Sequence, residues 1–114
     1  MMSLLTDAYL ACLAQARQAR AAGEIDQAFA ALERAHVLGQ RRFTQHLHVH
    51  WLMLLLAASQ YDSREIRGQL LRLALTPLGH LTGRLPLGNT GRANVSAFAP
   101  MQVDEATQRV LRGE

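Results

Sequence analysis

The feature that most constrains the fold is a helical period that runs through almost the whole chain up to about residue 80. Apolar side chains recur at spacings of three and four, so that each segment presents one apolar face. No stretch shows the sustained alternation of polar and apolar residues that is typical of a strand. The sequence therefore predicts an all-α fold with four main helices, over residues 4–22, 24–38, 44–60 and 63–76.

Turn and cap residues separate these segments. Gly23 and Gly39 are natural stops for the first two helices. Thr44 is a candidate N-cap of the third helix, and Asp62, followed three residues later by a glutamate, resembles the capping box of a fourth. Pro77 is expected to end or kink that fourth helix, because proline lacks the backbone N–H that helix propagation requires.

Residues 81–101 differ in character from the rest of the chain. Three glycines, two prolines and two asparagines in this stretch predict an irregular loop or arm, followed by a short helix over residues 104–112. Long irregular segments in small domains are often functional, so Asn89 and Asn94 in the "GNTGRANVS" stretch are candidate functional residues. The alternative is a set of tight turns that only cover the helices.

Composition restricts the class of protein. A chain of 114 residues, 49% apolar, predicts a single domain over residues 1–114. The single cysteine, Cys12, excludes an internal disulfide framework and a cysteine-rich zinc site. All 12 basic residues are arginines spread along the chain, so the formal charge of +3 does not indicate a nucleic-acid partner.

The apolar segments do not predict membrane insertion. The start of the sequence carries Asp7 inside its apolar part and lacks a basic leader, which is unlike a secretory signal. The longest uncharged apolar run, residues 51–58, is far shorter than the roughly 20 residues that a membrane helix needs. We expect a cytoplasmic protein.

The stretch "ERAHVLGQRRFTQHLHVHW" at residues 33–51 holds four of the five histidines. Glu33 and His36 are three apart, and His46 and His50 are four apart, so each pair shares a helix face. If the turn between them forms an antiparallel hairpin, His36 lies opposite His46 and Glu33 opposite His50. Three imidazoles and a carboxylate form a ligand set for zinc, iron, nickel or copper(II).

The fourth predicted helix brings further polar residues near this cluster. Glu65 and Gln69 are four apart. They are candidates to fix the tautomer of a ligand histidine by a hydrogen bond to the ring nitrogen that does not bind the metal. A second glutamate–histidine pair, which di-iron bundles need, is missing, so a mononuclear site is favoured. His48 points away from His46 and His50, and His80 has no predicted place in the site.

Other interpretations stay open at the level of sequence. The histidines and Glu33 can also be ordinary surface or capping residues. No nucleophile stands beside a recognisable base, so the only catalysis that the sequence suggests is an activity that depends on the metal. The main alternative to metal binding is a protein-interaction module, whose apolar faces dock a partner or a second copy.

Two resemblances are carried by local motifs. Residues 20–40, including "AAGEIDQAFAALERAHVLGQ", resemble part of a tetratricopeptide repeat, which implies a packed pair of antiparallel helices. The segments "LERAHVLGQ", "HVHWLML" and "GNTGRANVS", in this order, resemble the bacterial family known as domain of unknown function 3703. That resemblance implies a small cytoplasmic protein without a settled activity and a link to heavy-metal resistance or homeostasis. The predicted architecture is a tetratricopeptide-like hairpin extended to four helices, with an irregular arm and a short terminal helix.

Overall fold

The computed structural model describes residues 3–113, and the regular structure in this part of the chain is entirely helical. The all-α fold is therefore confirmed. The five helices are α1 (Leu4–Ala21), α2 (Ile25–Gly39), α3 (Phe43–Ser59), α4 (Ser63–Thr82) and α5 (Glu105–Leu111).

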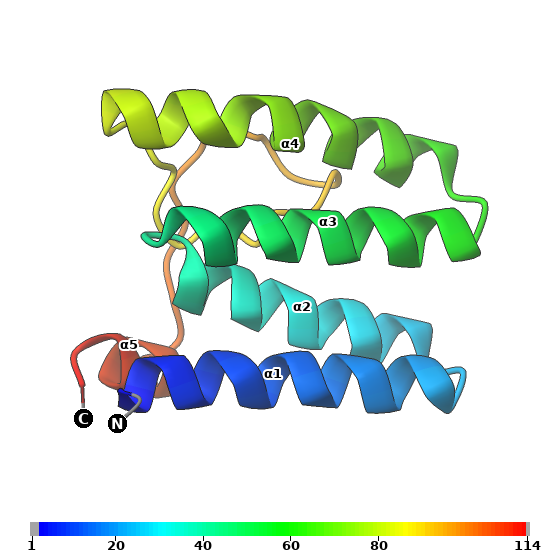
Figure 1. Ribbon diagram of the computed structural model, residues 1–114, viewed down its shortest axis with the longest axis horizontal. Helices are drawn as coiled ribbons and strands as arrows, with labels where there is room; N and C mark the ends of the chain where they lie inside the picture. The colour runs from blue at the N-terminus through cyan, green and yellow to red at the C-terminus, as the bar shows by residue number, and fades with distance from the viewer. Residues whose placement is uncertain (1–2, 114) are drawn as a thin grey trace.

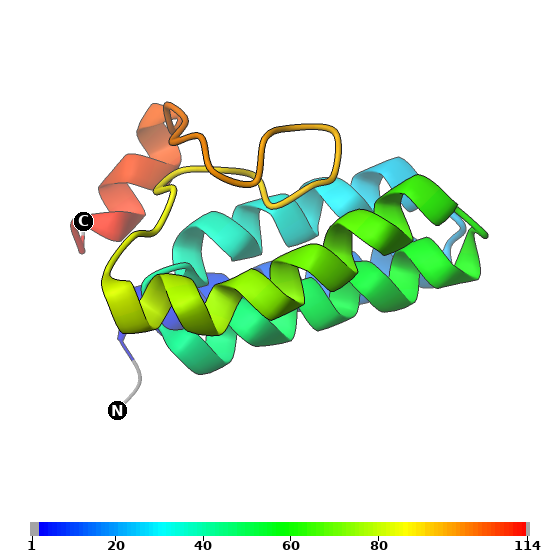
Figure 2. The ribbon, with the colours of Figure 1, turned by 90° about the horizontal axis from the view of Figure 1, so that it is seen from above.

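The four long helices lie side by side in chain order, and each packs against its neighbours in the sequence (Figure 1). The short helix α5 packs against α1 and α2. Residues 83–104, which we call the arm, contain no helix or strand and cross the side of the array between α2 and α4 (Figure 2). Packing between consecutive helices is general to helical repeats, while the tetratricopeptide resemblance itself stays a prediction.

The apolar core lies between α1, α2 and α3, because only these helices supply fully buried apolar side chains. Three of them are alanines on α2, Ala28, Ala31 and Ala35, each at most 2% exposed. Such small side chains let neighbouring helices approach closely, and the larger Phe29 and Met53 fill the space around them. Through this core, α3 packs against the hairpin of α1 and α2.

Helix α4 reverses the usual pattern. Its buried residues are all polar and follow a 4-3-4 spacing along one stripe: Glu65, Gln69, Arg72 and Thr76. Several of its leucines are instead exposed, including Leu71, Leu78 and Leu81. The polar stripe is buried because the arm lies against it, and buried polar groups of this kind must find hydrogen-bond partners.

The helix starts differ in part from the sequence prediction. Helix α3 begins at Phe43 with Arg42 in the N-cap position and no side-chain cap, so the prediction that Thr44 caps it was wrong. Asp62 does cap α4, since its side chain accepts a hydrogen bond from the backbone N–H of Glu65. The carboxylate of Glu65 turns inward, where it accepts hydrogen bonds from the side chain of Gln69 and from the arm.

Helix α4 also continues past the proline that was expected to end it. Pro77 lies inside the helix, which runs to Thr82 and ends at Gly83, whose left-handed φ of 74° is a common helix stop. Pro77 removes one backbone hydrogen bond. The preceding turn is held by the Thr76 hydroxyl, which donates to the carbonyl of Arg72. The added residues of α4 bring the half-buried His80 within hydrogen-bond distance of His46.

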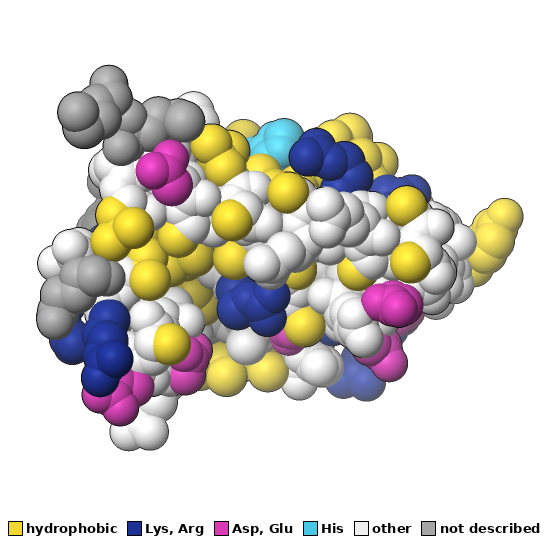
Figure 3. Space-filling view, turned by 90° about the horizontal axis from the view of Figure 1, so that it is seen from below, with side chains coloured by type: hydrophobic (Ala, Val, Ile, Leu, Met, Phe, Trp, Pro, Cys, Tyr) yellow, Lys and Arg dark blue, Asp and Glu magenta, His cyan; other side chains and the backbone are white. Residues whose placement is uncertain are grey.

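The outer surface is mixed in character. The side of the molecule on which α1 lies, opposite α4, shows hydrophobic side chains interspersed with polar and charged ones (Figure 3). Several large apolar residues of the protein are exposed, among them Trp51 and Leu55 on α3. None of the helices in residues 3–113 combines the length and the apolar composition that crossing a membrane requires.

Candidate metal centre

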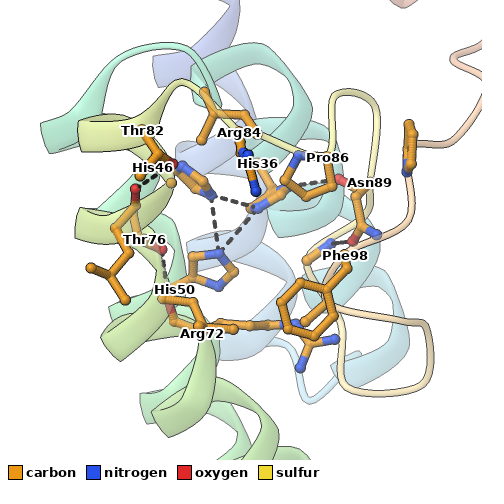
Figure 4. A pocket seen from close by; sticks show the side chains of 17 residues that line it. His36, His46, His50, Arg72, Thr76, Thr82, Arg84, Pro86, Asn89 and Phe98 are labelled. Carbon is orange, nitrogen blue, oxygen red and sulfur yellow. Dashed lines mark hydrogen bonds between the residues drawn. The ribbon is translucent and has the colours of Figure 1, made fainter.

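Three histidines from two helices converge in the interior, beneath the arm (Figure 4). His36 comes from α2, and His46 and His50 come from successive turns of α3. Their Nε2 atoms form a nearly equilateral triangle with sides of 3.0, 3.1 and 3.2 Å. All three side chains are buried, at 2–4% exposure. The same three residues are the group whose ligand atoms are close enough together to hold one metal ion.

The other ring nitrogen of each histidine is also engaged. The Nδ1–H of His36 donates to the backbone carbonyl of Asn89 in the arm, at 2.7 Å. Nδ1 of His50 lies 2.8 Å from Oε1 of Gln69 on α4. Since Asn89 offers a carbonyl, which can only accept, His36 must carry its proton on Nδ1.

Gln69 fixes the tautomer of His50 in the same way. Its side-chain NH2 donates to the carboxylate of Glu65 at 2.7 Å and to the carbonyl of Gly91 at 2.8 Å. Both of these partners only accept, so the amide oxygen of Gln69 must face His50. Nδ1 of His50 therefore carries the proton and donates a hydrogen bond to Gln69. This leaves a lone pair on Nε2 of His50.

His46 has a different outer partner. Its Nδ1 lies 2.9 Å from Nε2 of His80, which stands in the extra turns of α4 beyond Pro77. Either of these nitrogens can be the donor, because both belong to imidazoles. Of the three histidines, only His46 can carry its proton on Nε2, where it faces the other two.

The three neutral histidines have too few protons to hydrogen-bond all three Nε2–Nε2 contacts of the triangle. In the neutral state, Nε2 of His36 and Nε2 of His50 both present lone pairs at 3.1 Å. A single proton on Nε2 of His46 can serve the two contacts that involve His46, but no proton is available for the third. A cation placed over the triangle would accept all three lone pairs, as in metal sites where each histidine donates its outer N–H to a fixed acceptor.

Burial keeps the three imidazoles neutral. Loss of solvation, together with the neighbouring histidines, lowers the pKa of His36 well below 6.5. Burial first, and then His50 and His80, lower the pKa of His46 to about 3. Burial lowers the pKa of His50 to about 4, although its hydrogen bond to Gln69 acts in the opposite direction. Neutral imidazole is the form that binds metal, so the site is in its ligating state at neutral pH.

The size of the triangle fits a metal ion. Zinc–imidazole bonds are roughly 2.0–2.1 Å long. Three nitrogens that lie 3.0–3.2 Å apart are close enough together to bind one such ion. Three protein ligands are one fewer than in a closed zinc site, so an ion held by them could take a further ligand.

Glu33 does not join this group. We predicted it opposite His50, as the fourth ligand, but the three ligand atoms that converge all belong to histidines. Glu33 is half-buried, and burial raises the pKa of its carboxyl group; Arg92 acts in the opposite direction and Glu65 in the same one. The predicted pairing placed one residue of α2 opposite each histidine of α3. In the structure His36 lies between two successive turns of α3 and contacts both His46 and His50, so no second residue of α2 is needed to complete the group.

The arm forms one wall of the site. Gly91 has a left-handed φ of 83°, and a Cβ atom there would lie 2.7 Å from the ring of His36. Asn89 is buried, and its side chain holds the arm together by donating to the carbonyls of Ser96 and Ala99. Asn94, the other asparagine singled out from the sequence, lies in an exposed turn.

The arm is fastened to α4 by an ion pair. Arg92 Nε donates to the carboxylate of Glu65 at 2.9 Å, and the backbone N–H of Ala93 donates to the same group. The guanidinium of Arg92 also lies 3.8 Å above the ring of Phe29 on α2. Through Glu65 and Gln69, this pair connects the arm to His50.

His80 is the site residue that sequence reasoning missed. The polar stripe of α4 continues from Thr76 to His80 at a spacing of four, so the signal was present in the helical period. It was discounted because Pro77 was expected to end the helix. The carbonyl of Asn89 had no sequence signal as a partner of His36, since any residue supplies a backbone carbonyl.

The fold and the site define this chain as a small all-helical protein with a buried cluster of three histidines under an irregular arm. It belongs to the family described as protein of unknown function DUF3703, whose model matches residues 3–111. No curated protein and no solved structure shows significant similarity to the chain.

Proposed function

We propose that this protein binds one divalent transition metal ion through Nε2 of His36, His46 and His50. The observation that carries the proposal is the convergence of three buried Nε2 atoms within 3.2 Å of one another, with every Nδ1 engaged from outside. In the absence of a cation this arrangement leaves two lone pairs facing each other in a buried space, which costs free energy. A metal ion removes that cost.

The donor set favours zinc, iron, nickel or copper(II). Imidazole nitrogen suits all of these ions, and the affinity of one site for them generally rises toward copper(II). The thiol of Cys12 belongs to the apolar core between the first helices, so thiolate does not contribute to the cluster. This argues against a trap for softer ions such as copper(I).

The site suits metal handling with an accessible coordination position. A structural zinc site is usually closed by four protein ligands, whereas here three histidines occupy one side of the ion. An open position can exchange water for another ligand, or activate it as a metal-dependent enzyme would. We assign the protein to metal homeostasis, and an enzymatic role is the weaker option.

The test is metal content of the untagged protein, measured by elemental analysis after incubation with each ion and removal of the excess. We expect about one ion per chain, and its loss or strong weakening in His36→Ala, His46→Ala and His50→Ala. His48→Ala is the matched control, because His48 stands on the same helix as two of the ligands but is exposed. Protein that takes up none of the four ions, or a His48→Ala variant that loses metal as the others do, would refute the proposal.

The alternative of a protein-interaction module stays a prediction. The exposed leucines of α4, Leu71, Leu78 and Leu81, form a stripe on the side away from its buried polar residues, as an apolar docking face would. Sedimentation velocity of the apoprotein and the metal-loaded protein would reveal self-association through such a face.

A further inference from the structure

A cavity of about 470 Å³ opens beside the three histidines and is lined by them, by α4 and by the arm. Figure 4 shows the three histidines among the residues that line this space, so an ion bound by them would adjoin the cavity. The volume is far more than one water molecule needs and lies within the range of small-molecule sites. The cavity is therefore the place where an additional ligand of the metal would sit.

The charged side chains that line the cavity are arginines. Arg72 and Arg84 line it, and none of the lining residues within 3–113 is an aspartate or a glutamate. The guanidinium of Arg72 is largely buried and donates to two backbone carbonyls, those of Gly68 and Val95. Glu65, which does not line the cavity, interacts electrostatically with Arg72, but the two hydrogen-bond partners of the guanidinium are neutral carbonyls and no ion pair joins it to Glu65. With a divalent ion in place, the cavity would attract an anion.

The rest of the lining is mostly apolar. Leucine, proline and phenylalanine side chains from α4 and the arm form the walls, including Leu75, Leu85 and Phe98. Phe98 is 72% exposed and stands in the arm, so this wall is partly open to solvent. A purely inorganic anion would make little use of such walls, whereas the body of an organic acid would bury apolar surface against them.

We propose that the open side of the three-histidine site binds a small organic carboxylate. Its carboxylate group occupies the free position of the metal and is attracted by Arg72 and Arg84, and its apolar body lies against Leu75, Leu85 and Phe98. This inference rests on the proposed metal-binding function, because the carboxylate needs the ion as its anchor. It names the class of ligand that the site would accept or act on.

The experiment uses cobalt(II) as the metal, because its visible absorption changes when a ligand enters its coordination sphere. Cobalt uptake is measured first, and the cobalt-loaded protein is then titrated with acetate, hexanoate, inorganic phosphate and the neutral hexanamide. Each methylene that is fully buried should tighten binding about fourfold. Because the cavity is partly open, we expect hexanoate to bind at least tenfold more tightly than acetate. Hexanamide should leave the spectrum unchanged.

Arginine variants separate charge from packing. Arg84→Gln should weaken hexanoate binding about threefold to tenfold while cobalt uptake stays the same, since Arg84 is not a ligand. Arg64→Gln is the matched control, because Arg64 is an exposed arginine of α4 that does not line the cavity. Arg72→Gln should act more strongly than Arg84→Gln, provided that circular dichroism shows the helices intact.

Three results would overturn the inference, and they differ from the failure of metal binding. If cobalt binds but neither acid changes its spectrum, the cavity does not hold an anionic ligand of the metal. If acetate or phosphate binds as tightly as hexanoate, the apolar walls contribute nothing. If Arg84→Gln and Arg72→Gln bind hexanoate as tightly as the control Arg64→Gln does, the two arginines of the cavity do not attract the ligand. If cobalt itself does not bind, the proposed function fails together with this inference.

Discussion

Gly91 offers a test of whether the arm positions the metal ligands. Its φ of 83° lies in the left-handed region, and an added Cβ would lie 2.7–3.0 Å from three atoms of the His36 ring. Gly91→Ala therefore combines two penalties, a backbone conformation that L-residues avoid and a steric contact with a ligand. Gly23 is a matched control, because its φ is 76° and an added Cβ there meets nothing within 4 Å.

The two penalties can be estimated separately. Placing alanine in the left-handed region costs roughly 1–2 kcal/mol. Alanine also lowers the conformational entropy of the unfolded chain relative to glycine, which offsets roughly 0.4–1 kcal/mol of that cost. Gly23→Ala should therefore lower the free energy of unfolding by about 1 kcal/mol. Overpacking a filled interior adds roughly 1–3 kcal/mol, so Gly91→Ala should lower it by about 2–4 kcal/mol. That is a large share of the roughly 5–15 kcal/mol that stabilises a typical domain.

Metal affinity is the second readout. Displacing His36 spoils a triangle whose sides are 3.0–3.2 Å, so Gly91→Ala should weaken metal binding about tenfold to a hundredfold, as changes around metal ligands commonly do. Gly23→Ala should leave it unchanged. Urea denaturation of the apoprotein and competition with a chromophoric chelator measure the two quantities. If Gly91→Ala and Gly23→Ala agree in both, the arm does not hold His36 in place, and the reasoning is wrong.

Three further predictions concern the surroundings of the triangle. Glu33→Gln should keep one ion per chain by elemental analysis, because its carboxylate lies outside the group of converging ligand atoms; loss of the ion would restore Glu33 as a ligand. His80→Ala should keep the stoichiometry but weaken affinity about tenfold in chelator competition, since Nδ1 of His46 loses its partner; unchanged affinity would show that this contact does not orient His46. Acid should destabilise the apoprotein. Burial sets the pKa of His46 to about 3 and that of His50 to about 4, both below the ordinary 6.5, so only the unfolded chain takes up protons between these values. Stability should be constant above pH 6.5 and fall as the pH drops from there toward 4, at about 1.4 kcal/mol per pH unit for each histidine. Urea denaturation at pH 7.5, 6 and 5 checks this, and equal stability at all three would contradict it.

The helical part of the fold was predictable because its signals are local. Apolar residues at spacings of three and four define α1, α2 and α3, and Gly23 and Gly39 mark the turns between them. The end of α4 was not predictable in this way. Pro77 normally stops a helix, but its cost is limited to about one turn, and contacts beyond it, such as the one between His80 and His46, favour continuation.

The site was predictable to the extent that it is built from one helical hairpin. Spacing alone places His36, His46 and His50 on facing helix surfaces, and the structure brings these three together. The spacing could not predict that His36 contacts both His46 and His50, because this depends on the angle at which α2 and α3 cross. Matching the residue numbers across the hairpin therefore placed Glu33 in the site, whereas the ligand atoms that converge belong to the three histidines.

The inverted pattern of α4 connects the fold to the proposed function. A helix that buries glutamate, glutamine, arginine and threonine on one stripe stabilises its own packing poorly, because each of these groups must recover its lost solvation through hydrogen bonds. Here most of those bonds lead to the arm or to a histidine: Gln69 reaches both Gly91 and His50, and Arg72 reaches Val95. An apolar stripe would have packed α4 more simply, but it would have left His50 without its partner Gln69 and the arm, which holds His36, without its hydrogen bonds to α4. The polar stripe therefore makes structural sense when the histidines must keep their Nδ1 protons turned outward and their Nε2 lone pairs turned toward a common point, which is the requirement of a metal ion.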